Sequence, residues 1–249
     1  MDAMIVDGTT LAVLAVIFLA TFIRSAFGFG EALISVPLLA LVPVPIDVAV
    51  PLAVLLSITV ALVVVVQDWH HIHLRSAGRL VLSTLLGIPL GLLLLKAAPE
   101  PVVKATLAVV IISFSTYCLF NQHRLELKDD RLAWLFGFGA GILGGAYGMN
   151  GPPLVVYGAL RRWSPEQFRA TLQGYFLPAS LVGLLGYWLT DLWVPAVTRY
   201  YLLSLLPALA ATLLGRAINR RLKGHRFLLC VHVLLIAVGV TLLVQSMRR

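Results

Sequence analysis

Long apolar runs separated by short polar stretches make up most of this chain. A helix needs about 20 residues to cross the hydrocarbon core of a bilayer. Three runs of roughly this length lack Asp, Glu, Lys and Arg: Val48–Val66, Ala170–Thr190 and Phe227–Met247. Three slightly shorter runs are flanked by Arg or Lys, which can extend to the membrane surface: Leu80–Leu95, Ala105–Phe120 and Tyr200–Gly215. The pattern predicts an all-α polytopic membrane protein.

Two further apolar segments are interrupted by glycine. The segment Gly8–Ile46 contains SAFGFGEALISVP, and Leu132–Leu160 contains GFGAGILGGAYGMNGPPLVVY up to Tyr157. Each interrupted segment is followed by three ordinary spans, which indicates an internal duplication. We therefore expect a first membrane repeat at 1–121, a cytoplasmic connecting loop at 122–130 and a second membrane repeat at 131–249. Interrupted hydrophobic segments at matching positions point to the binding site of a transporter.

The distribution of Lys and Arg predicts how these segments meet the membrane. If each crossed once, the two sides would hold 8 and 10 Lys/Arg, with Arg24 left inside the membrane. If each returned to its own side as a helical hairpin, the two sides would hold 13 and 5. Only the hairpin arrangement gives the excess of positive charge that cytoplasmic loops carry.

A re-entrant hairpin plus three transmembrane helices makes an odd number of crossings, so the two repeats have inverted topology. Both chain termini are then predicted outside the cell. Non-helical backbone at membrane depth is tolerated only where protein or a water-filled cavity shields it. We therefore expect the two hairpin tips to meet near the midplane.

At each tip a helix is predicted to begin after glycine, around Ala32 and at Gly151. The N-terminus of a helix presents N–H groups and the positive end of the helix dipole, which favours an anion. Gly28, Gly30 and Gly148 would let the backbone turn and a ligand approach closely. The alternative is that these glycines only allow tight helix packing.

Arg24 and Glu31 are ionisable residues inside the first interrupted segment, where a charge costs on the order of 2.5–3.5 kcal/mol even on permissive scales. Either Arg24 serves the substrate and Glu31 carries a proton or coupling ion, or the two form an ion pair that locks the hairpin. In the second half, Arg169 and Gln173 share a helix face, although Arg169 could equally anchor its helix at the cytoplasmic surface. The predicted substrate-binding residues are Arg24, Gly28, Gly30, Ala32, Tyr147, Gly148, Asn150, Gly151, Gln173 and Tyr175, with Glu31 as the coupling residue.

Other functional classes find little support in the residues. The stretch HHIH, with His70, His71 and His73, lacks a companion carboxylate or thiolate cluster beyond Asp68, so we expect no metal site. No nucleophile and base pair indicates an enzyme, and no cofactor is expected. The net charge of +8 lies in the loops and sets membrane orientation rather than nucleic-acid binding.

Three stretches resemble the TauE/SafE family of sulfite and organosulfonate permeases: GFGEALISVPLL at Gly28–Leu39, GILGGAYGMNGPPLVVY at Gly141–Tyr157 and FRATLQGYF at Phe168–Phe176. The first departs from the commoner GFGGG-like run at Glu31 and Ala32, which makes Glu31 a candidate for what is particular to this member. The resemblance implies a secondary transporter, in a bacterial-type inner membrane, for a small anion such as a sulfite, an organosulfonate or a carboxylate. The alternatives are an anion channel and a non-transporting membrane scaffold, and a lipid-facing homodimer is also open.

Overall fold

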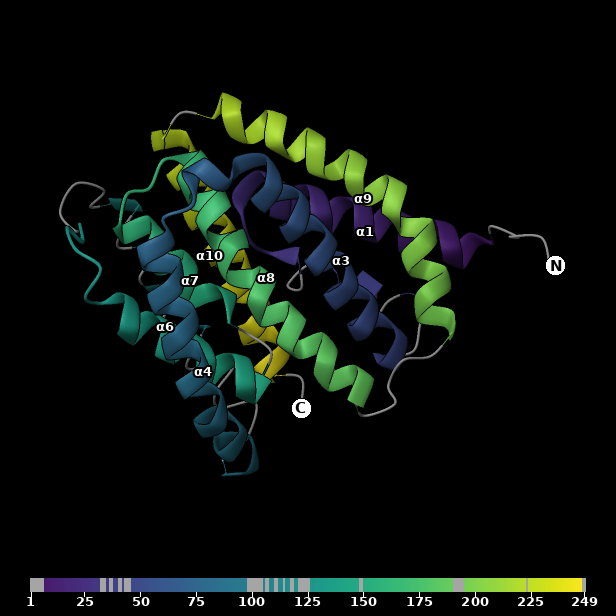
Figure 1. Ribbon diagram of the computed structural model, residues 1–249, viewed down its shortest axis with the longest axis horizontal. Helices are drawn as coiled ribbons and strands as arrows, with labels where there is room; N and C mark the ends of the chain where they lie inside the picture. Colours follow the sequence, from purple (N-terminus) through teal and green to yellow (C-terminus); the bar gives the residue numbers. More distant parts are fainter. Residues whose placement is uncertain are drawn as a thin grey trace. The chain divides into compact units, whose positions relative to one another are not determined.

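The computed structural model describes two compact units, each built from two separate parts of the chain (Figure 1). Unit 1 contains Met1–Ile72 and Arg169–Arg221, and unit 2 contains His73–Phe168 and Leu222–Arg249. The units are described separately below. The residues that the structure describes are 7–31, 35, 38–39, 42, 46–97, 105, 108–109, 112–113, 115–116, 119–120, 126–147, 150–189, 195–222 and 224–247.

The described residues form helices and their connections, with no strand among them. The α-helices are α1 (Gly8–Phe27), α3 (Ile46–Asp68), α4 (Leu74–Ala97), α6 (Ala133–Tyr147), α7 (Gly151–Leu160), α8 (Pro165–Leu189), α9 (Pro195–Arg221) and α10 (Gly224–Met247), and η1 (Trp69–His71) is a short 3-10 helix. The predicted all-α class is confirmed.

Four of these helices are long and apolar enough to cross a membrane: Gly8–Phe27, Pro51–His71, Pro195–Arg221 and Leu229–Met247. Large apolar side chains such as Leu86 on α4 and Leu206 on α9 are exposed, as expected of helices that face lipid. Some helices are longer than the uncharged runs that predict them. Helix α9, for example, continues past Gly215 through the charged residues Arg216–Arg221. This is an integral membrane protein.

The helix breaks that the glycines predict are present in both interrupted segments. Helix α1 ends at Phe27, and Gly28 has a φ of 86°, in the left-handed region that favours glycine. Gly30 has a φ of 98°, so the chain changes direction between these two residues. In the second segment α6 ends at Tyr147 and α7 begins at Gly151.

Unit 1 is held together by the packing of α1 on α9, which lie side by side in Figure 1. Gly215 of α9 sits so close to α1 that a Cβ atom there would come within 2.9 Å of the Phe22 carbonyl oxygen. A core of apolar side chains joins α1, α3 and α9, with the buried Leu39 packed among them. Leu39, which follows the break at Gly28, therefore packs back against α1.

Unit 2 is built in a similar manner around α4 and α6, the most extensive helix contact among the described residues (Figure 1). The two backbones touch at Gly87 of α4 and Gly141 of α6, where added Cβ atoms would overlap the facing helix. The Thr84 hydroxyl donates a hydrogen bond of 2.8 Å to the carbonyl oxygen of Gly137. Small residues let membrane helices approach this closely, which strengthens dispersion and hydrogen bonding between them.

The segment that precedes α6 is hydrogen bonded to the end of α7. The N–H of Leu127, before α6, donates to the carbonyl oxygen of Leu160, the last residue of α7, at 2.9 Å. The Arg161 guanidinium donates to the Leu127 carbonyl oxygen at 2.7 Å. The chain that enters α6 and the chain that leaves α7 thus lie together at one end of unit 2.

Each compact unit draws helices from both predicted repeats, because α9 and α8 from Arg169 onward belong to unit 1 while α4 belongs to unit 2. The compact units therefore do not correspond to the predicted repeats, and the repeat boundaries stay a prediction.

The close contact of α4 with α6 should make Gly141 intolerant of a side chain. Gly141→Ala would place Cβ against the carbonyl of Thr84 and near the Cα of Gly87, both of which are backbone. We expect a loss of about 1–3 kcal/mol of stability, typical of overpacking. The loss would be measured as a lower Tm of the detergent-purified protein.

Gly139 supplies the matched control on the same helix, because a Cβ there meets nothing within 4 Å. Gly139→Ala should leave Tm unchanged or raise it, since alanine favours a helix by about 1 kcal/mol over glycine. Equal effects of the two substitutions would contradict the packing described for Gly141.

Candidate functional site

Arg24 lies at the end of α1 with only 4% of its surface exposed. Its guanidinium makes five hydrogen bonds, the number of N–H groups that it carries. Nε and Nη2 donate to Gln173 Oε1 at 3.1 and 2.8 Å, and Nη2 also donates to the Ser57 carbonyl oxygen. Nη1 donates to the Glu31 carboxylate and to Ser57 Oγ. Arg24 and Glu31 therefore form a buried ion pair, and every donor of Arg24 is engaged.

Gln173 connects this ion pair to the broken end of α1. Its Oε1 accepts both bonds from Arg24, while its Nε2 donates to the carbonyl oxygen of Gly28 at 3.0 Å. The Phe176 ring lies under the guanidinium, with its centroid 5.3 Å from Arg24 Cζ. Arginine over an aromatic face is a favourable cation–π geometry.

The carbonyl groups at the end of α1 lose their helical partners where the helix breaks. Three side chains from α8 and α9 replace those partners. Arg169 Nε donates to the Ser25 carbonyl oxygen at 2.5 Å, and Asn219 Nδ2 donates to that of Ala26 at 2.8 Å. Gln173 Nε2 donates to the carbonyl oxygen of Gly28. Each unsatisfied backbone group costs several kcal/mol inside a membrane, so these bonds allow the helix to stop there.

Arg169 is 1% exposed, so its side chain is buried among protein groups. Its Nη1 donates to the carboxylate of Asp68, the last residue of α3. The same carboxylate accepts a bond of 2.5 Å from Arg216 Nη2, and Arg220 Nη2 lies 3.7 Å from it. We call Arg169, Arg216 and Arg220, with Asp68 between them, the arginine cluster.

The second break presents fewer donors than a helix N-terminus ordinarily does. Asn150 precedes α7 without capping it through its side chain, and Pro152 lies in the first turn, as the sequence predicts. Pro152 and Pro153 carry no N–H. Of the first four residues of α7, only Gly151 and Leu154 therefore retain a donor, and the helix dipole supplies the rest of the positive potential there.

The predicted site residues divide between the two units. In unit 1 the structure brings together Arg24, Gly28, Glu31 and Gln173. Tyr175 is fully buried on α8, two residues after Gln173. Asn150 and Gly151 belong to unit 2. Ala32, Gly148 and the side chain of Tyr147 lie outside the described residues. A meeting of the two helix breaks stays a prediction, as do the substrate-binding roles.

Unit 2 has a buried polar network of its own, centred on Asp130. Its carboxylate accepts from Ser76 Oγ at 2.6 Å and from the Tyr157 hydroxyl at 2.9 Å, and Arg161 lies 3.3 Å away. Burial alone would raise the pKa of Asp130, but these hydrogen bonds and the Arg161 charge outweigh it and hold the pKa below its usual value. The network joins the starts of α4 and α6 to the end of α7.

Within the described residues no group of His, Cys, Asp and Glu could hold a metal ion. His73 of the HHIH stretch accepts or donates a hydrogen bond with Ser76 at 3.1 Å and stacks on Trp163. It thus extends the Asp130 network.

Four residues of this region were not predicted from the sequence: Ser57, Arg216, Asn219 and Arg220. Asp68 was visible as an acidic residue at the end of an apolar run, and Arg216, Asn219 and Arg220 have the spacing of one helix face. Their convergence depends on α3, whose Asp68 is 101 residues before Arg169 of α8 and 148 before Arg216 of α9.

The bonds of Gln173 should be necessary for the stability of unit 1. Gln173→Met keeps the length of the side chain but leaves the Gly28 carbonyl and two N–H groups of Arg24 without their partner. Unsatisfied buried groups cost about 1–3 kcal/mol each, so we expect a marked fall in Tm of the purified protein.

Gln167→Met is the control, because it makes the same change on the same helix in an exposed setting. Gln167 Oε1 accepts from the N–H of Ser164, and Ser164 Oγ accepts from the N–H of Gln167, as in a capping box. Its loss should cost at most about 1 kcal/mol. A Gln173→Met protein as stable as Gln167→Met would contradict the bridging role.

The chain matches the family "Sulfite exporter TauE/SafE" over residues 13–242, which is nearly its whole length. A search of curated proteins and a search of solved structures each gave no significant match.

Proposed function

The chain belongs to the TauE/SafE sulfite exporter family, and we propose that it is a secondary transporter that carries a small anion across the membrane. The observation that carries this proposal is the buried Arg24, held by Glu31, Gln173 and Ser57 at the point where α1 breaks. A buried guanidinium at a helix break is a site that a sulfite, an organosulfonate or a carboxylate would recognise.

The saturated bonds of Arg24 suggest how the anion and a proton are coupled. Because all five donors are engaged, an anion reaches Arg24 only if one partner leaves. Protonation of Glu31 removes the charge that holds it to Arg24, and the anion then takes the place of the carboxylate. The proton on Glu31 and the anion on Arg24 would therefore travel together.

Three features support two inverted repeats with re-entrant hairpins. The main helix pairs are α1 with α9 and α4 with α6, which are equivalent pairs if the repeats correspond in order. Leu127, before α6, is bonded to Leu160 and Arg161 at the end of α7. Helices of 15 and 10 residues measure about 22 and 15 Å, too short for a hydrocarbon core of about 30 Å. In this proposal the two helix breaks, with Gly28, Gly30, Asn150 and Gly151, meet near the midplane.

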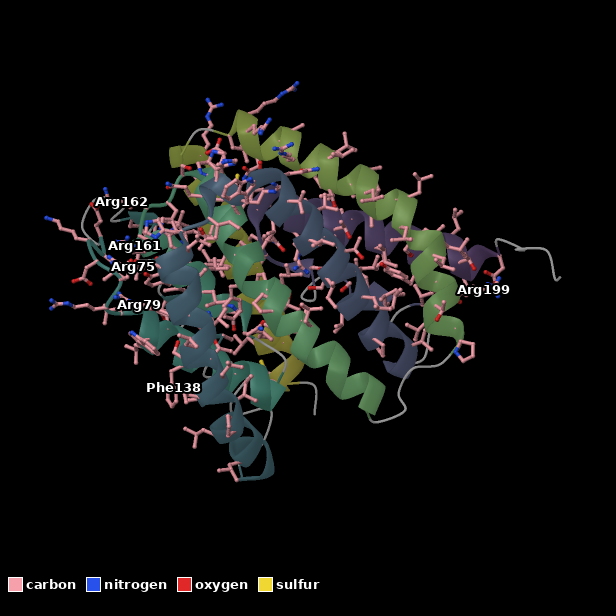
Figure 2. All side chains as sticks on the ribbon, viewed as in Figure 1. Arg75, Arg79, Phe138, Arg161, Arg162 and Arg199 are labelled. Atoms are coloured by element: carbon pink, nitrogen blue, oxygen red, sulfur yellow. The ribbon has the colours of Figure 1, made fainter. Side chains whose placement is uncertain are left out.

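The arginines of unit 2 support the proposed orientation. Arg75, Arg79, Arg161 and Arg162 gather along one side of that unit, and the Asp130 network ties the helix ends that carry Arg75 and Arg161 (Figure 2). Such a concentration of positive charge marks the cytoplasmic side. Both termini would then lie outside. The resemblance to the family, and not this charge, is the basis for proposing a membrane of the bacterial inner type.

Flux measurements in proteoliposomes test the function. Uptake and efflux of sulfite, an organosulfonate and a carboxylate should saturate with concentration and respond to an imposed pH gradient. Unsaturable, ohmic flux would identify an anion channel instead. If none of these anions moved or shifted Tm, the chain would be a non-transporting scaffold.

Glu31→Gln should separate anion movement from its driving force. Glutamine imitates the protonated carboxyl group, so Arg24 stays available and anion exchange continues. Flux driven by a pH gradient should fall to the level of empty liposomes. Unchanged pH dependence in this variant would refute coupling through Glu31.

Glu126→Gln is the matched control for this substitution. Glu126 is about half exposed and lies 3.7 Å from Arg162, outside the buried ion pair. Its replacement should change neither anion exchange nor flux driven by pH.

A further inference from the structure

We propose that the arginine cluster is a second binding site, which takes a small oxyanion and in which Asp68 occupies the place of that anion while the site is empty. The site lies at the end of α3 and α9, one helical turn along α8 from Gln173. It is a binding site of its own and does not depend on the transport proposed above.

The first argument is charge. One carboxylate, that of Asp68, faces three guanidinium groups, so two positive charges remain. The other acidic side chains of unit 1 that the structure describes are engaged elsewhere: Asp7 caps α1 by accepting from the Thr10 N–H, and Glu31 binds Arg24. Arg169 is buried and shares this carboxylate with Arg216, which is 23% exposed, and an uncompensated charge costs more the more deeply it is buried. A bound anion would remove this excess.

The second argument is the set of donors left over. Arg169 Nη2 and Arg216 Nε are buried and have no hydrogen-bond partner among the described residues. Nη2 belongs to the same guanidinium whose Nη1 binds Asp68. An oxyanion with three or more acceptor oxygens can bond several arginines at once, whereas one carboxylate supplies only two oxygens.

The third argument is access. Exposure of the side chains falls from 55% at Arg220 to 23% at Arg216, 7% at Asp68 and 1% at Arg169. The cluster therefore opens to its surroundings at Arg220 and is closed at Arg169. An anion would meet Arg220 first and exchange with Asp68 deeper in the cluster.

The oxyanion could be free in solution or part of a lipid headgroup, since both present phosphate-like or sulfate-like oxygens to arginine. The full-length protein in uncharged detergent would be titrated with sodium sulfate and with inorganic phosphate, against sodium chloride at equal ionic strength, with Tm as the readout. A second series would use nanodiscs with and without phosphatidylglycerol.

We expect sulfate or phosphate to raise Tm to a plateau that chloride does not reproduce. Asp68→Asn should lower Tm without anion but increase the apparent affinity about tenfold, because the competing carboxylate is gone. Arg220→Gln should weaken the affinity about tenfold, the effect of one charge-assisted hydrogen bond. Arg221→Gln is the control, since Arg221 is exposed and adjacent in sequence, and it should change nothing.

A response confined to the nanodiscs with phosphatidylglycerol, and lost in Arg220→Gln, would assign the site to a lipid headgroup. If Asp68→Asn fails to fold, the comparison of Arg220→Gln with Arg221→Gln decides. The proposal is overturned if neither free anions nor anionic lipid raise Tm, or if the response is the same in Arg220→Gln and Arg221→Gln. An anion response that Arg220→Gln leaves intact belongs to another site.

Discussion

The structure of unit 1 depends on satisfying the carbonyl groups that are released where α1 ends. In a membrane no water reaches such groups, so a helix can stop only where other parts of the protein donate to it. Arg169, Gln173 and Asn219 supply those donors from α8 and α9. Two of these three also bind a buried charged group, Arg169 to Asp68 and Gln173 to Arg24. The same side chains therefore both satisfy the carbonyl groups at the end of α1 and hold charged groups inside the protein.

This arrangement links the ion pair of Arg24 with Glu31 to the arginine cluster through short steps along α8. Arg169 and Gln173 are four residues apart and face the same end of α1. A change at either one alters both a backbone carbonyl and a charged group. Buried polar networks of this kind act as units, so single substitutions in them do not add.

Much of the fold could be predicted from the sequence, because its signals are local. Uncharged runs predict the helices, and glycine predicts the breaks at Gly28 and Gly151, with Pro152 beside it in the second case. The pairing of Arg24 with Glu31 was one of two readings that a separation of seven residues allowed. Ser57, Asp68 and Asn219 could not be found in this way, since each acts on a partner far away in sequence. The single sequence records no signal of such pairings.

Gly215 shows how an apolar contact can matter for chemistry in this protein. A side chain there would press on Ser25 and Ala26, the residues whose carbonyl groups Arg169 and Asn219 bind. The disturbance would reach polar groups that Gly215 never touches. In a screen for inactive variants, substitutions at this glycine would therefore group with those of the charged residues, although its own surroundings are those of ordinary helix packing. Along α9, the positions least tolerant of substitution would be those next to these hydrogen-bonded carbonyl groups, whether or not they are the most buried.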